Sequence, residues 1–143
     1  MLNEIIKNKI KEVRLNKKLM PLTSFQKKLE KTKKDFKKAI TKNKLNLIAE
    51  IKRKSPSQDL NRKNYDSGIK NFDIKQIVSC YNLYADAISV LTDKKFFNGS
   101  LDDLRAVSKL TKLPILRKDF IIDEYQIYES RSYNADAILL IAS

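Results

Sequence analysis

A glutamate and a lysine stand close together where a short apolar run ends. Leu47–Ile51 has the composition of a buried strand, and Glu50 and Lys52 occupy positions that point to the same side of it. Burying a carboxylate and an ammonium costs several kcal/mol unless the two groups pair or face a polar cavity. The pair, with the Ser-Pro-Ser stretch that follows it, therefore predicts a functional site. The alternative is a structural ion pair at the rim of a sheet.

The same change from apolar to polar residues occurs at two later strand ends. Thr92 and Asp93 follow the apolar run 87–91, and Lys118 and Asp119 come soon after another apolar run. A lysine beside an opposite charge stays protonated, while partial desolvation lowers its pKa toward useful acidity. A lysine in this setting can serve as a general acid. The alternative for Lys118 and Asp119 is an exposed charge pair that contributes little.

Helical and extended patterns alternate along the chain. The apolar spacing of residues 2–19 predicts an amphipathic helix that Pro21 stops, and Ser24 is expected to cap a second helix that reaches residue 40. The later predicted strands cover 47–51, 87–91, 115–116 and 135–142. Between them we expect three helices, one capped by Asp73, one capped by Ser100 and Asp103, and one begun by Asp123 and Gln126 and ended by Asn134. A surface loop over 58–72 and a loop over 96–99 complete the pattern. Strands that alternate with helices predict an α/β protein with a parallel sheet buried on both faces.

The formal charge of +13 is concentrated at the start of the sequence. Residues 1–44 hold 15 Lys and Arg against 4 Asp and Glu, which leaves 15 against 13 for residues 45–143. The early positive charges are mostly lysines with few aromatic residues between them, which is typical of a solvated helix surface. We therefore expect no nucleic-acid partner. A non-enzymatic basic protein that binds anions or nucleic acid remains the alternative, and it would require a steep salt dependence of binding.

The sequence also limits location and metal chemistry. No apolar run approaches the ~20 residues of a membrane span, and the N-terminus lacks the apolar core of a signal peptide, so we expect no membrane partner and a cytoplasmic protein. Without His and with Cys80 as its only cysteine, the chain has no obvious zinc site and no intramolecular disulfide. Cys80 is expected to be a small buried hydrophobe.

Several long strings point to one family. They are PLTSFQ at 21–26, IAEIKRKSPS at 48–57, AISVLTDKKFFNGS at 87–100, LPILRKDFIIDEYQI at 113–127 and ADAILLIAS at 135–143. Together, and in this order, they closely resemble the indole-3-glycerol phosphate synthases of tryptophan biosynthesis. The resemblance covers the chain from about residue 20 onward.

The resemblance implies a TIM (β/α)8 barrel of roughly 250 residues with a helical segment in front of its first strand. Residues 1–44 would then be the basic helical N-terminal extension, and residues 45–143 the first half of the barrel. The implied activity is that of a carboxy-lyase, which closes 1-(2-carboxyphenylamino)-1-deoxyribulose 5-phosphate into indole-3-glycerol phosphate with loss of carbon dioxide and water. The implied partner is this small phosphorylated substrate, and no metal or organic cofactor is implied.

The family's catalytic residues match positions singled out above. The resemblance implies that Lys118 is the general acid that protonates the substrate ketone oxygen. It implies that Lys52 holds an anionic end of the substrate, most simply the phosphate, and that Glu50 orients the lysines and the substrate hydroxyl groups. In a barrel, such groups come from the carboxyl ends of the strands, which is where these residues fall.

The resemblance adds three substrate-binding residues. Ser55 would contact the substrate, and Phe97 and Phe120 would wall the pocket against the anthranilate ring. Each phenylalanine alone is as consistent with a core as with a pocket. The sequence departs from the family after the Ser-Pro-Ser stretch, where Gln58 and Asp59 stand in place of a common glycine.

The largest departure is a set of missing parts. In the family, strands five to eight bring the general-base glutamate, the Asn and Arg that hold the substrate carboxylate, and the glycine-rich phosphate loops, and this sequence holds none of them. We therefore expect a truncated chain with little or no activity alone. A half-barrel leaves its first and fourth strands with unpaired edges, which predicts self-association or a complementing C-terminal half-barrel from another chain.

Overall fold

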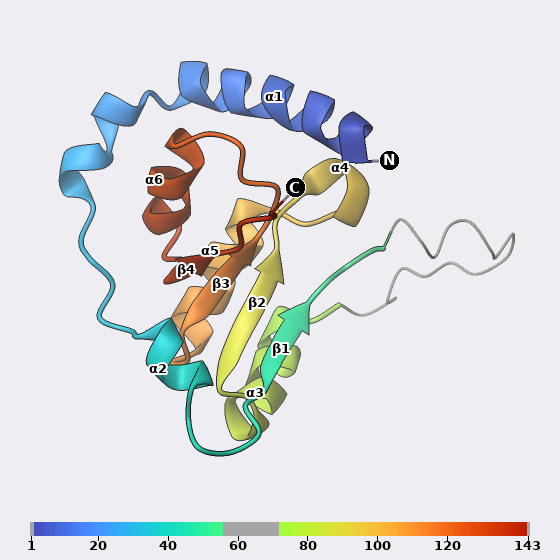
Figure 1. Cartoon of the computed structure of the whole chain (residues 1–143), viewed down its shortest axis with the longest axis vertical. Coiled ribbons are helices and arrows are strands. Elements are labelled where there is room, and N and C mark those ends of the chain that lie inside the picture. The colour runs from blue at the N-terminus through green and yellow to red at the C-terminus, as the bar shows by residue number, and fades with distance from the viewer. Residues whose placement is uncertain (1, 56–71, 143) are drawn as a thin grey trace, which may run out of the picture.

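The computed structural model describes residues 2–55 and 72–142. In this part of the chain, a four-stranded parallel sheet carries helices behind it and a long N-terminal helix across the carboxyl ends of its strands (Figure 1). The helices are α1 (Leu2–Leu19), α2 (Phe36–Ile40), α3 (Ile74–Tyr84), α4 (Lys94–Phe97), α5 (Leu101–Leu110) and α6 (Tyr125–Ser132), and short 3-10 turns are η1 (Leu22–Ser24) and η2 (Gln26–Lys28). The strands are β1 (Ile48–Ile51), β2 (Ala87–Leu91), β3 (Ile115–Lys118) and β4 (Ala137–Ile138).

Helix α1 spans the segment that the apolar spacing predicted. Its buried residues are Ile5, Lys9 and Val13, which recur every four positions and so share one face. The end of the helix is held against α6, because the Tyr125 hydroxyl donates to the carbonyl of Met20 at 3.0 Å. The helix is therefore held across the strand ends along much of its length, and Lys9 occupies the middle of its buried face.

The predicted second helix from Ser24 to residue 40 is wrong. The segment makes two 3-10 turns, runs on without regular structure, and becomes helical only at α2, where the carboxylate of Asp35 accepts from the Lys38 amide at 2.8 Å. The lysines between the two ends repel one another and supply no apolar stripe, so a continuous helix would have nothing to bury. Ser24 bonds back to the Pro21 carbonyl instead of capping a helix.

The sheet confirms the predicted alternation of strands and helices. Its order is β1-β2-β3-β4 and every neighbouring pair is parallel, so all the carboxyl ends lie along one edge. The register places Glu50 opposite Ser89 and Leu91 opposite Lys118. The polar residues that follow three of the strands are therefore brought to the same edge of the molecule.

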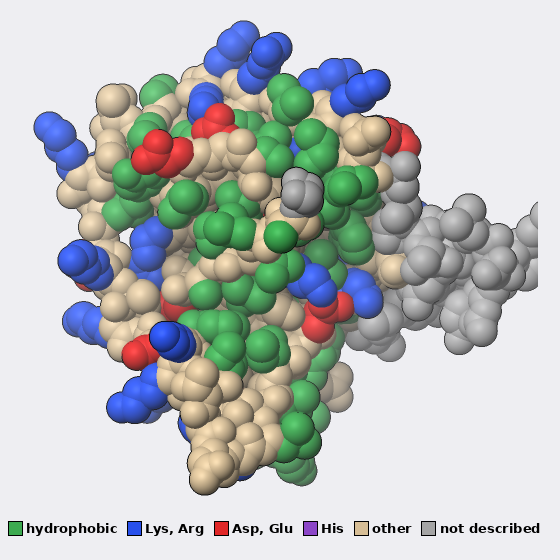
Figure 2. Space-filling model, in the orientation of Figure 1, with side chains coloured by type: hydrophobic (Ala, Val, Ile, Leu, Met, Phe, Trp, Pro, Cys, Tyr) green, Lys and Arg blue, Asp and Glu red, His purple; other side chains and the backbone are tan. Residues whose placement is uncertain are grey.

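The core lies between the sheet and the helices α3 and α5. It contains Ile51, Val78, Ile88, Val90, Leu104, Val107, Ile115 and Ala135. The expected burial of both sheet faces holds for β2, whose five residues are all buried, but not for the edge strand β1, where Ile48 is 41% exposed. The face of the sheet opposite α3 and α5, which carries Ile48, is therefore open. Figure 2 shows hydrophobic side chains gathered over this open face. Cys80 is exposed and not buried as expected, because it lies on the side of α3 that faces away from Val78.

Two aspartates fasten the amino ends of the strands. Asp86 accepts from the Leu47 amide at 3.1 Å and Asp136 accepts from the Ile115 amide at 2.9 Å, and each stands in an Ala-Asp-Ala-Ile sequence. The predicted fourth strand over 135–142 is too long, since regular pairing covers only Ala137–Ile138. In the described part of the chain β4 pairs with β3 alone, so less backbone pairing holds it extended.

The predicted helix ends are largely confirmed. Asp73 accepts from the Lys75 amide at 2.8 Å, and Ser100 accepts from the Asp103 amide at 3.0 Å. The other predicted signals also hold, because Gln126 accepts from the Asp123 amide at 3.2 Å and Asn134 has the positive φ of 68° that ends a helix. The segment predicted as a loop over 96–99 begins instead inside the short helix α4. The predicted surface loop over 58–72 falls outside the described residues except for Phe72.

Candidate active site

Lys118, Glu50 and Lys52 form one cluster at the carboxyl ends of β1 and β3. Lys118 Nζ donates to Glu50 Oε2, and Lys52 Nζ lies 3.1 Å from Glu50 Oε1. Strand β2 separates the two strands, and its residue in register with Glu50 is the small Ser89, which leaves room for the ion pair to span it. Both lysine side chains are 40% exposed and the Glu50 side chain is 27% exposed, so the cluster is open to a ligand.

The environment keeps the Glu50 carboxylate ionised. Partial burial alone would raise the pKa of Glu50, but the hydrogen bonds and charges of Lys118 and Lys52 outweigh burial and hold that pKa below its ordinary value. The Tyr81 hydroxyl fixes the backbone beneath it by donating to the Glu50 carbonyl at 2.8 Å. A fixed carboxylate between two ammonium groups can orient both of them toward one substrate.

The two predicted aromatic residues pack against each other. The ring centroids of Phe97 and Phe120 are 6.4 Å apart, with an interplanar angle of 35°, and both residues are half-buried. Phe120 comes two residues after Lys118, and Phe97 ends α4, which follows β2. The structure therefore brings together two aromatic rings from neighbouring strand ends, and half-burial is what a pocket wall requires.

The turn that carries Phe97 is held close to the end of β2. Asp93 accepts from the Phe96 amide at 2.8 Å, and the Gly99 amide donates to the Asp93 carbonyl at 2.9 Å. A Cβ on Gly99 would lie 2.1 Å from the Leu91 carbonyl oxygen, so only glycine allows this approach. The position of the Phe97 ring thus depends on backbone geometry as well as on packing.

Ser55 lies four residues past the end of β1, half-buried, at the edge of the described segment. Its contact with the substrate stays a prediction. The stretch leading to it is anchored by Arg53, which donates to the two carboxylate oxygens of Asp103 at 3.0 and 2.7 Å and stacks 4.2 Å from the centroid of Phe72. Asp103, predicted as a partner in helix capping, therefore also ties the loop after β1 to α5.

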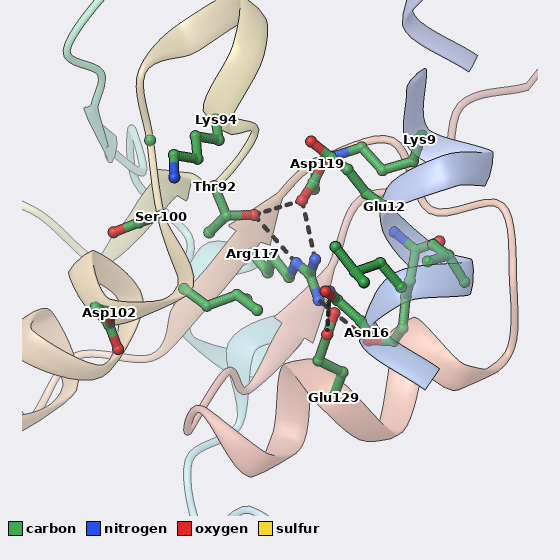
Figure 3. Close-up of a pocket in the computed structure, with 15 residues that line it drawn as sticks. Lys9, Glu12, Asn16, Thr92, Lys94, Ser100, Asp102, Arg117, Asp119 and Glu129 are labelled. Atoms are coloured by element: carbon green, nitrogen blue, oxygen red, sulfur yellow. Dashed lines mark hydrogen bonds and ion pairs between the residues drawn. The ribbon is translucent and has the colours of Figure 1, made fainter. Parts of the chain in front are cut away.

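A second charged cluster lies under α1, on the opposite side of β3 from the first cluster. Lys9 Nζ is 2.9 Å from Asp93 Oδ2, 2.9 Å from Asp119 Oδ1 and 2.6 Å from Glu12 Oε2. Figure 3 shows Lys9, Glu12 and Asp119 of this cluster. Lys9 is 3% exposed and both aspartates are buried. A cavity of about 320 Å³ lies beside this cluster. It is lined in part by Lys94 of α4 and by residues 99–102 at the amino end of α5.

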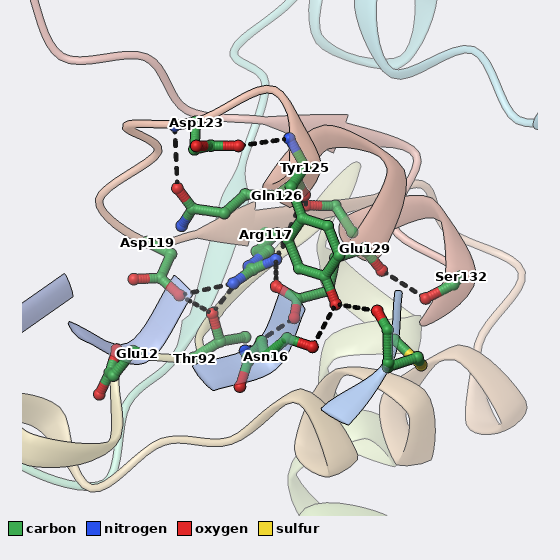
Figure 4. A network of polar contacts seen from close by, with 12 residues as sticks. Glu12, Asn16, Thr92, Arg117, Asp119, Asp123, Tyr125, Gln126, Glu129 and Ser132 are labelled. Atoms are coloured by element: carbon green, nitrogen blue, oxygen red, sulfur yellow. Dashed lines mark hydrogen bonds and ion pairs between the residues drawn. The ribbon is translucent and has the colours of Figure 1, made fainter. Parts of the chain in front are cut away.

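Arg117 extends the buried cluster toward α6. Its guanidinium donates to Asp119 at 2.9 Å, to Glu129 at 2.9 Å and to Thr92 at 3.1 Å (Figure 4). Glu129 in turn accepts from the Asn16 amide group at 2.8 Å, which closes a path from β3 through α6 to α1. Burial alone would raise the pKa of Asp119, but the charges of Arg117 and Lys9 outweigh burial and hold it below its ordinary value.

The buried cluster was missed in the sequence. Arg117 and Asp119 flank Lys118 in alternation, so a strand that points Lys118 to one side must point both neighbours to the other. Lys9 stands four residues from both Ile5 and Val13, in the middle of an apolar stripe. A charged residue in that place was the available signal that it pairs with charges on another element.

Within residues 2–55 and 72–142, no helix is long and apolar enough to cross a membrane. In the same ranges, no group of three or more His, Cys, Asp or Glu side chains is placed to hold a metal ion. The expectation that no cofactor is needed stays a prediction.

The fold and the site together define a class of protein. A helix in front of four consecutive parallel strands, with crossover helices and charged side chains at the carboxyl ends, is the arrangement of a (β/α)8-barrel enzyme over half of its strands. The family model described as indole-3-glycerol phosphate synthase matches residues 2–143, and the chain belongs to this family.

Of three curated relatives that match the chain, two carry the same name and the third is named as a tryptophan biosynthesis protein. An indole-3-glycerol phosphate synthase of Prochlorococcus marinus (strain AS9601) is 48% identical over 148 residues, which cover 100% of this chain and 48% of the relative. One from Caldanaerobacter subterraneus subsp. tengcongensis is 44% identical over 144 residues, 100% of this chain and 54% of the relative. The tryptophan biosynthesis protein TrpCF of Buchnera aphidicola subsp. Schizaphis graminum is 41% identical over 143 residues, 100% of this chain and 30% of the relative. The chain thus spans about half, or less, of the length of these relatives.

Proposed function

We propose that this chain provides the general-acid part of an indole-3-glycerol phosphate synthase, a carboxy-lyase of tryptophan biosynthesis that works in the cytoplasm. The observation that carries the proposal is the half-exposed cluster in which Glu50 pairs with both Lys118 and Lys52 on the open face of the sheet. A purely structural ion pair needs one lysine. Two lysines on one carboxylate leave positive charge available for an anionic substrate.

Lys118 is the proposed general acid. The substrate ring carbon that bears the carboxylate attacks the ketone carbon, and the ketone oxygen takes a proton from Lys118 as the new carbon–carbon bond forms. Loss of carbon dioxide then restores the aromatic ring, and loss of water completes the indole. Glu50 supports this role because it accepts a hydrogen bond from Lys118 and so orients the ammonium that gives up the proton at ring closure.

The remaining predicted residues would bind the substrate. Lys52 supplies charge for an anionic end, most simply the phosphate, and Ser55 contacts the substrate from the segment after β1. Phe97 and Phe120 would cover the anthranilate ring, for which their half-buried pair offers an aromatic surface. Within this proposal, residues 1–44 are the helical extension and residues 45–143 the first half of a barrel.

The open face of the sheet is the proposed place of the remaining strands. Ile48 of β1 is 41% exposed, and Leu140, which follows β4, is 68% exposed, as expected if apolar surface is covered by further strands. We propose that a complementing C-terminal half-barrel, or failing that a second copy of the chain, covers this face. The general base and most of the phosphate site would come with that half.

A chimera tests the function. It joins residues 1–142 of this chain to the part of the Caldanaerobacter relative that lies beyond the region matching this chain. Product is followed by indole absorbance and by release of carbon dioxide from 1-(2-carboxyphenylamino)-1-deoxyribulose 5-phosphate. We expect turnover by the chimera. A chimera that folds but forms no product would contradict the proposal.

The unfused chain tests the need for a partner. Alone it should show little or no turnover, since loss of a general base typically costs about 10²–10⁴-fold. Mixed with the separately produced C-terminal part of the relative, it should form a heterodimer by sedimentation and regain activity. Full turnover by the chain alone would show that no complementing half is required.

A further inference from the structure

The buried Lys9 of α1 joins two strand ends that the sequence does not connect directly. Its ammonium lies 2.9 Å from Asp93, at the end of β2, and 2.9 Å from Asp119, at the end of β3. These are the two ends from which the aromatic rings of the candidate site emerge. A single side chain from outside the sheet layer thus spans the gap between them.

Each aspartate also holds the loop that follows it. Asp93 uses its other oxygen, Oδ1, to cap α4, the helix that ends with Phe97. Asp119 accepts from the Phe120 amide at 2.8 Å through the same oxygen, Oδ1, that contacts Lys9. A movement of either carboxylate would therefore move the backbone that carries one of the two rings.

The positive charge of Lys9 is needed where it stands. Arg117 neutralises the side of Asp119 that faces α6, while Lys9 lies between Asp119 and Asp93, which is 0% exposed. Without the ammonium, two buried carboxylates would face each other across the strand ends and repel. Burial alone would lower the pKa of Lys9, but Asp119, Glu12 and Asp93 outweigh it and raise that pKa above its ordinary value, so Lys9 stays charged.

We propose that Lys9 is a positioning residue that sets the spacing of the β2 and β3 loops, so that Phe97 and Phe120 form one wall beside Lys118. The geometry of this link is independent of catalysis. What the wall does rests on the proposed function, because only that function supplies an aromatic substrate for it. The N-terminal helix is thereby part of the site's construction and more than a cover for the strand ends.

Lys17 offers a matched control on the same helix. It pairs with Asp123 at 2.7 Å and lies 6.0 Å from the ring centroid of Tyr125, which packs edge-on to Phe25 at 6.0 Å. Its side chain is 46% exposed. Removing its charge takes one ion pair from α1 without touching the strand-end carboxylates.

The test labels the full chain with fluorophenylalanine and records the fluorine NMR signals of its six Phe residues. Assignment uses single Phe→Leu variants. Lys9→Met should shift or broaden the signals of Phe97 and Phe120 and leave that of Phe36 unchanged. Lys17→Met should affect Phe25 and leave Phe97 and Phe120 in place. If Lys9→Met folds and the Phe97 and Phe120 signals keep their positions, the proposal is wrong.

A second variant covers the case in which Lys9→Met does not fold. Lys9→Arg keeps the charge, but a planar guanidinium cannot meet two carboxylates with the geometry of an ammonium. It should leave the helix content unchanged and still move the Phe97 and Phe120 signals. Unmoved signals in Lys9→Arg would show that Lys9 provides charge balance only, and the positioning role would fall.

Turnover separates this inference from the proposed function. In the active chimera, Lys9→Arg should lower kcat/KM by about tenfold to 100-fold, because small misplacements of reacting groups have effects of that order. Lys17→Met should stay within about twofold. An inactive parent chimera would overturn the proposed function while leaving the fluorine result to stand. Unchanged turnover in Lys9→Arg would refute the proposal that Lys9 positions the site.

Discussion

Lys118 and Asp119 are neighbours in the chain, yet they belong to two charged clusters of opposite character. Lys118 joins Glu50 and Lys52 on the open face of the sheet, where each lysine side chain is 40% exposed. Asp119 joins Lys9 and Arg117 on the other side, where all three side chains are almost fully buried. The alternation of a β-strand sends consecutive residues to these two environments.

The difference in exposure predicts which cluster serves function and which serves stability. An exposed ion pair contributes at most about 1 kcal/mol to stability. The charges of the open cluster can therefore pair with a ligand at little cost to the free energy of unfolding. A buried network adds little net stability over an apolar equivalent, but breaking it leaves uncompensated charge in the interior. We therefore expect substitutions on the open side to affect function and substitutions on the buried side to affect folding.

The largest effect on stability is expected from Arg117→Met. The variant leaves the carboxylates of Asp119 and Glu129 buried without their guanidinium, which should lower the free energy of unfolding by about 3–5 kcal/mol. Urea unfolding of the full chain measures this. Arg105→Met is the control, since Arg105 stacks on Tyr133 at 4.1 Å and its loss should cost about 1 kcal/mol or less. Equal effects of the two variants would remove the distinction between the clusters.

A smaller effect, on binding, is expected from Phe97→Leu. Losing one ring of the Phe97–Phe120 pair should weaken binding by about 1 kcal/mol, or roughly fivefold. The ligand is the substrate with its ketone reduced to an alcohol, which cannot close, and titration calorimetry on the chimera gives its Kd. Phe36→Leu, on α2, is the control and should leave Kd unchanged. Binding that survives Phe97→Leu intact would place Phe97 in the core and not in the pocket.

Lys118→Met should have a still smaller effect on stability. Glu50 keeps its contact with Lys52 at 3.1 Å, and the lost pair is half-exposed. We expect the free energy of unfolding to change by less than about 1 kcal/mol. The same urea titration that detects Arg117→Met provides the comparison, and a loss as large as that of Arg117→Met would mean that the open cluster is structural.

The smallest effect concerns acid stability at the opposite end of the strands. The hydrogen bond from Lys42, the Leu47 amide and the bond from Lys44 hold the pKa of Asp86 well below its ordinary value. Because the folded state lowers this pKa, the stabilisation is complete above the ordinary Asp value of about 3.9 and is lost as pH falls below it. As the pH falls below about 4, the Tm of the parent chain should therefore fall more steeply than that of Asp86→Asn. Parallel curves of Tm against pH for the two proteins would contradict a stabilising role for the ionised Asp86.

Local signals in the sequence predicted the sheet and most helix ends. Strand β2 was found with its bounds because all of its residues are apolar or small and buried, and Asp73 caps α3 as its side chain dictates. The helix from Ser24 failed because a serine and scattered apolar residues mark a helix only where something packs against them. Strand β4 is shorter than its apolar run because backbone pairing, and not composition, decides where a strand ends.

The open cluster was predictable from the sequence, whereas the partners of the buried lysine were not. Glu50 interrupts an apolar strand and Lys118 follows one, so their cost of burial shows in the sequence alone. Lys9 sits among the many lysines of the basic N-terminal segment, where its partners, Asp93 and Asp119, lie over 80 positions away. Its place in an apolar stripe marks it as buried, but only the docking of α1 across the strand ends, shown in Figure 1, decides which carboxylates it meets.

The turnover number of Lys118→Met in the chimera tests the central claim most directly. The unsubstituted chimera and the variant are compared at saturating substrate, after equal unfolding curves have shown that both are folded. If Lys118 is the general acid, kcat should fall by about 10²–10⁴-fold. A kcat within about threefold of the parent would show that the proton comes from elsewhere, and the cluster of Lys118, Glu50 and Lys52 would then be an ion pair at the rim of the sheet.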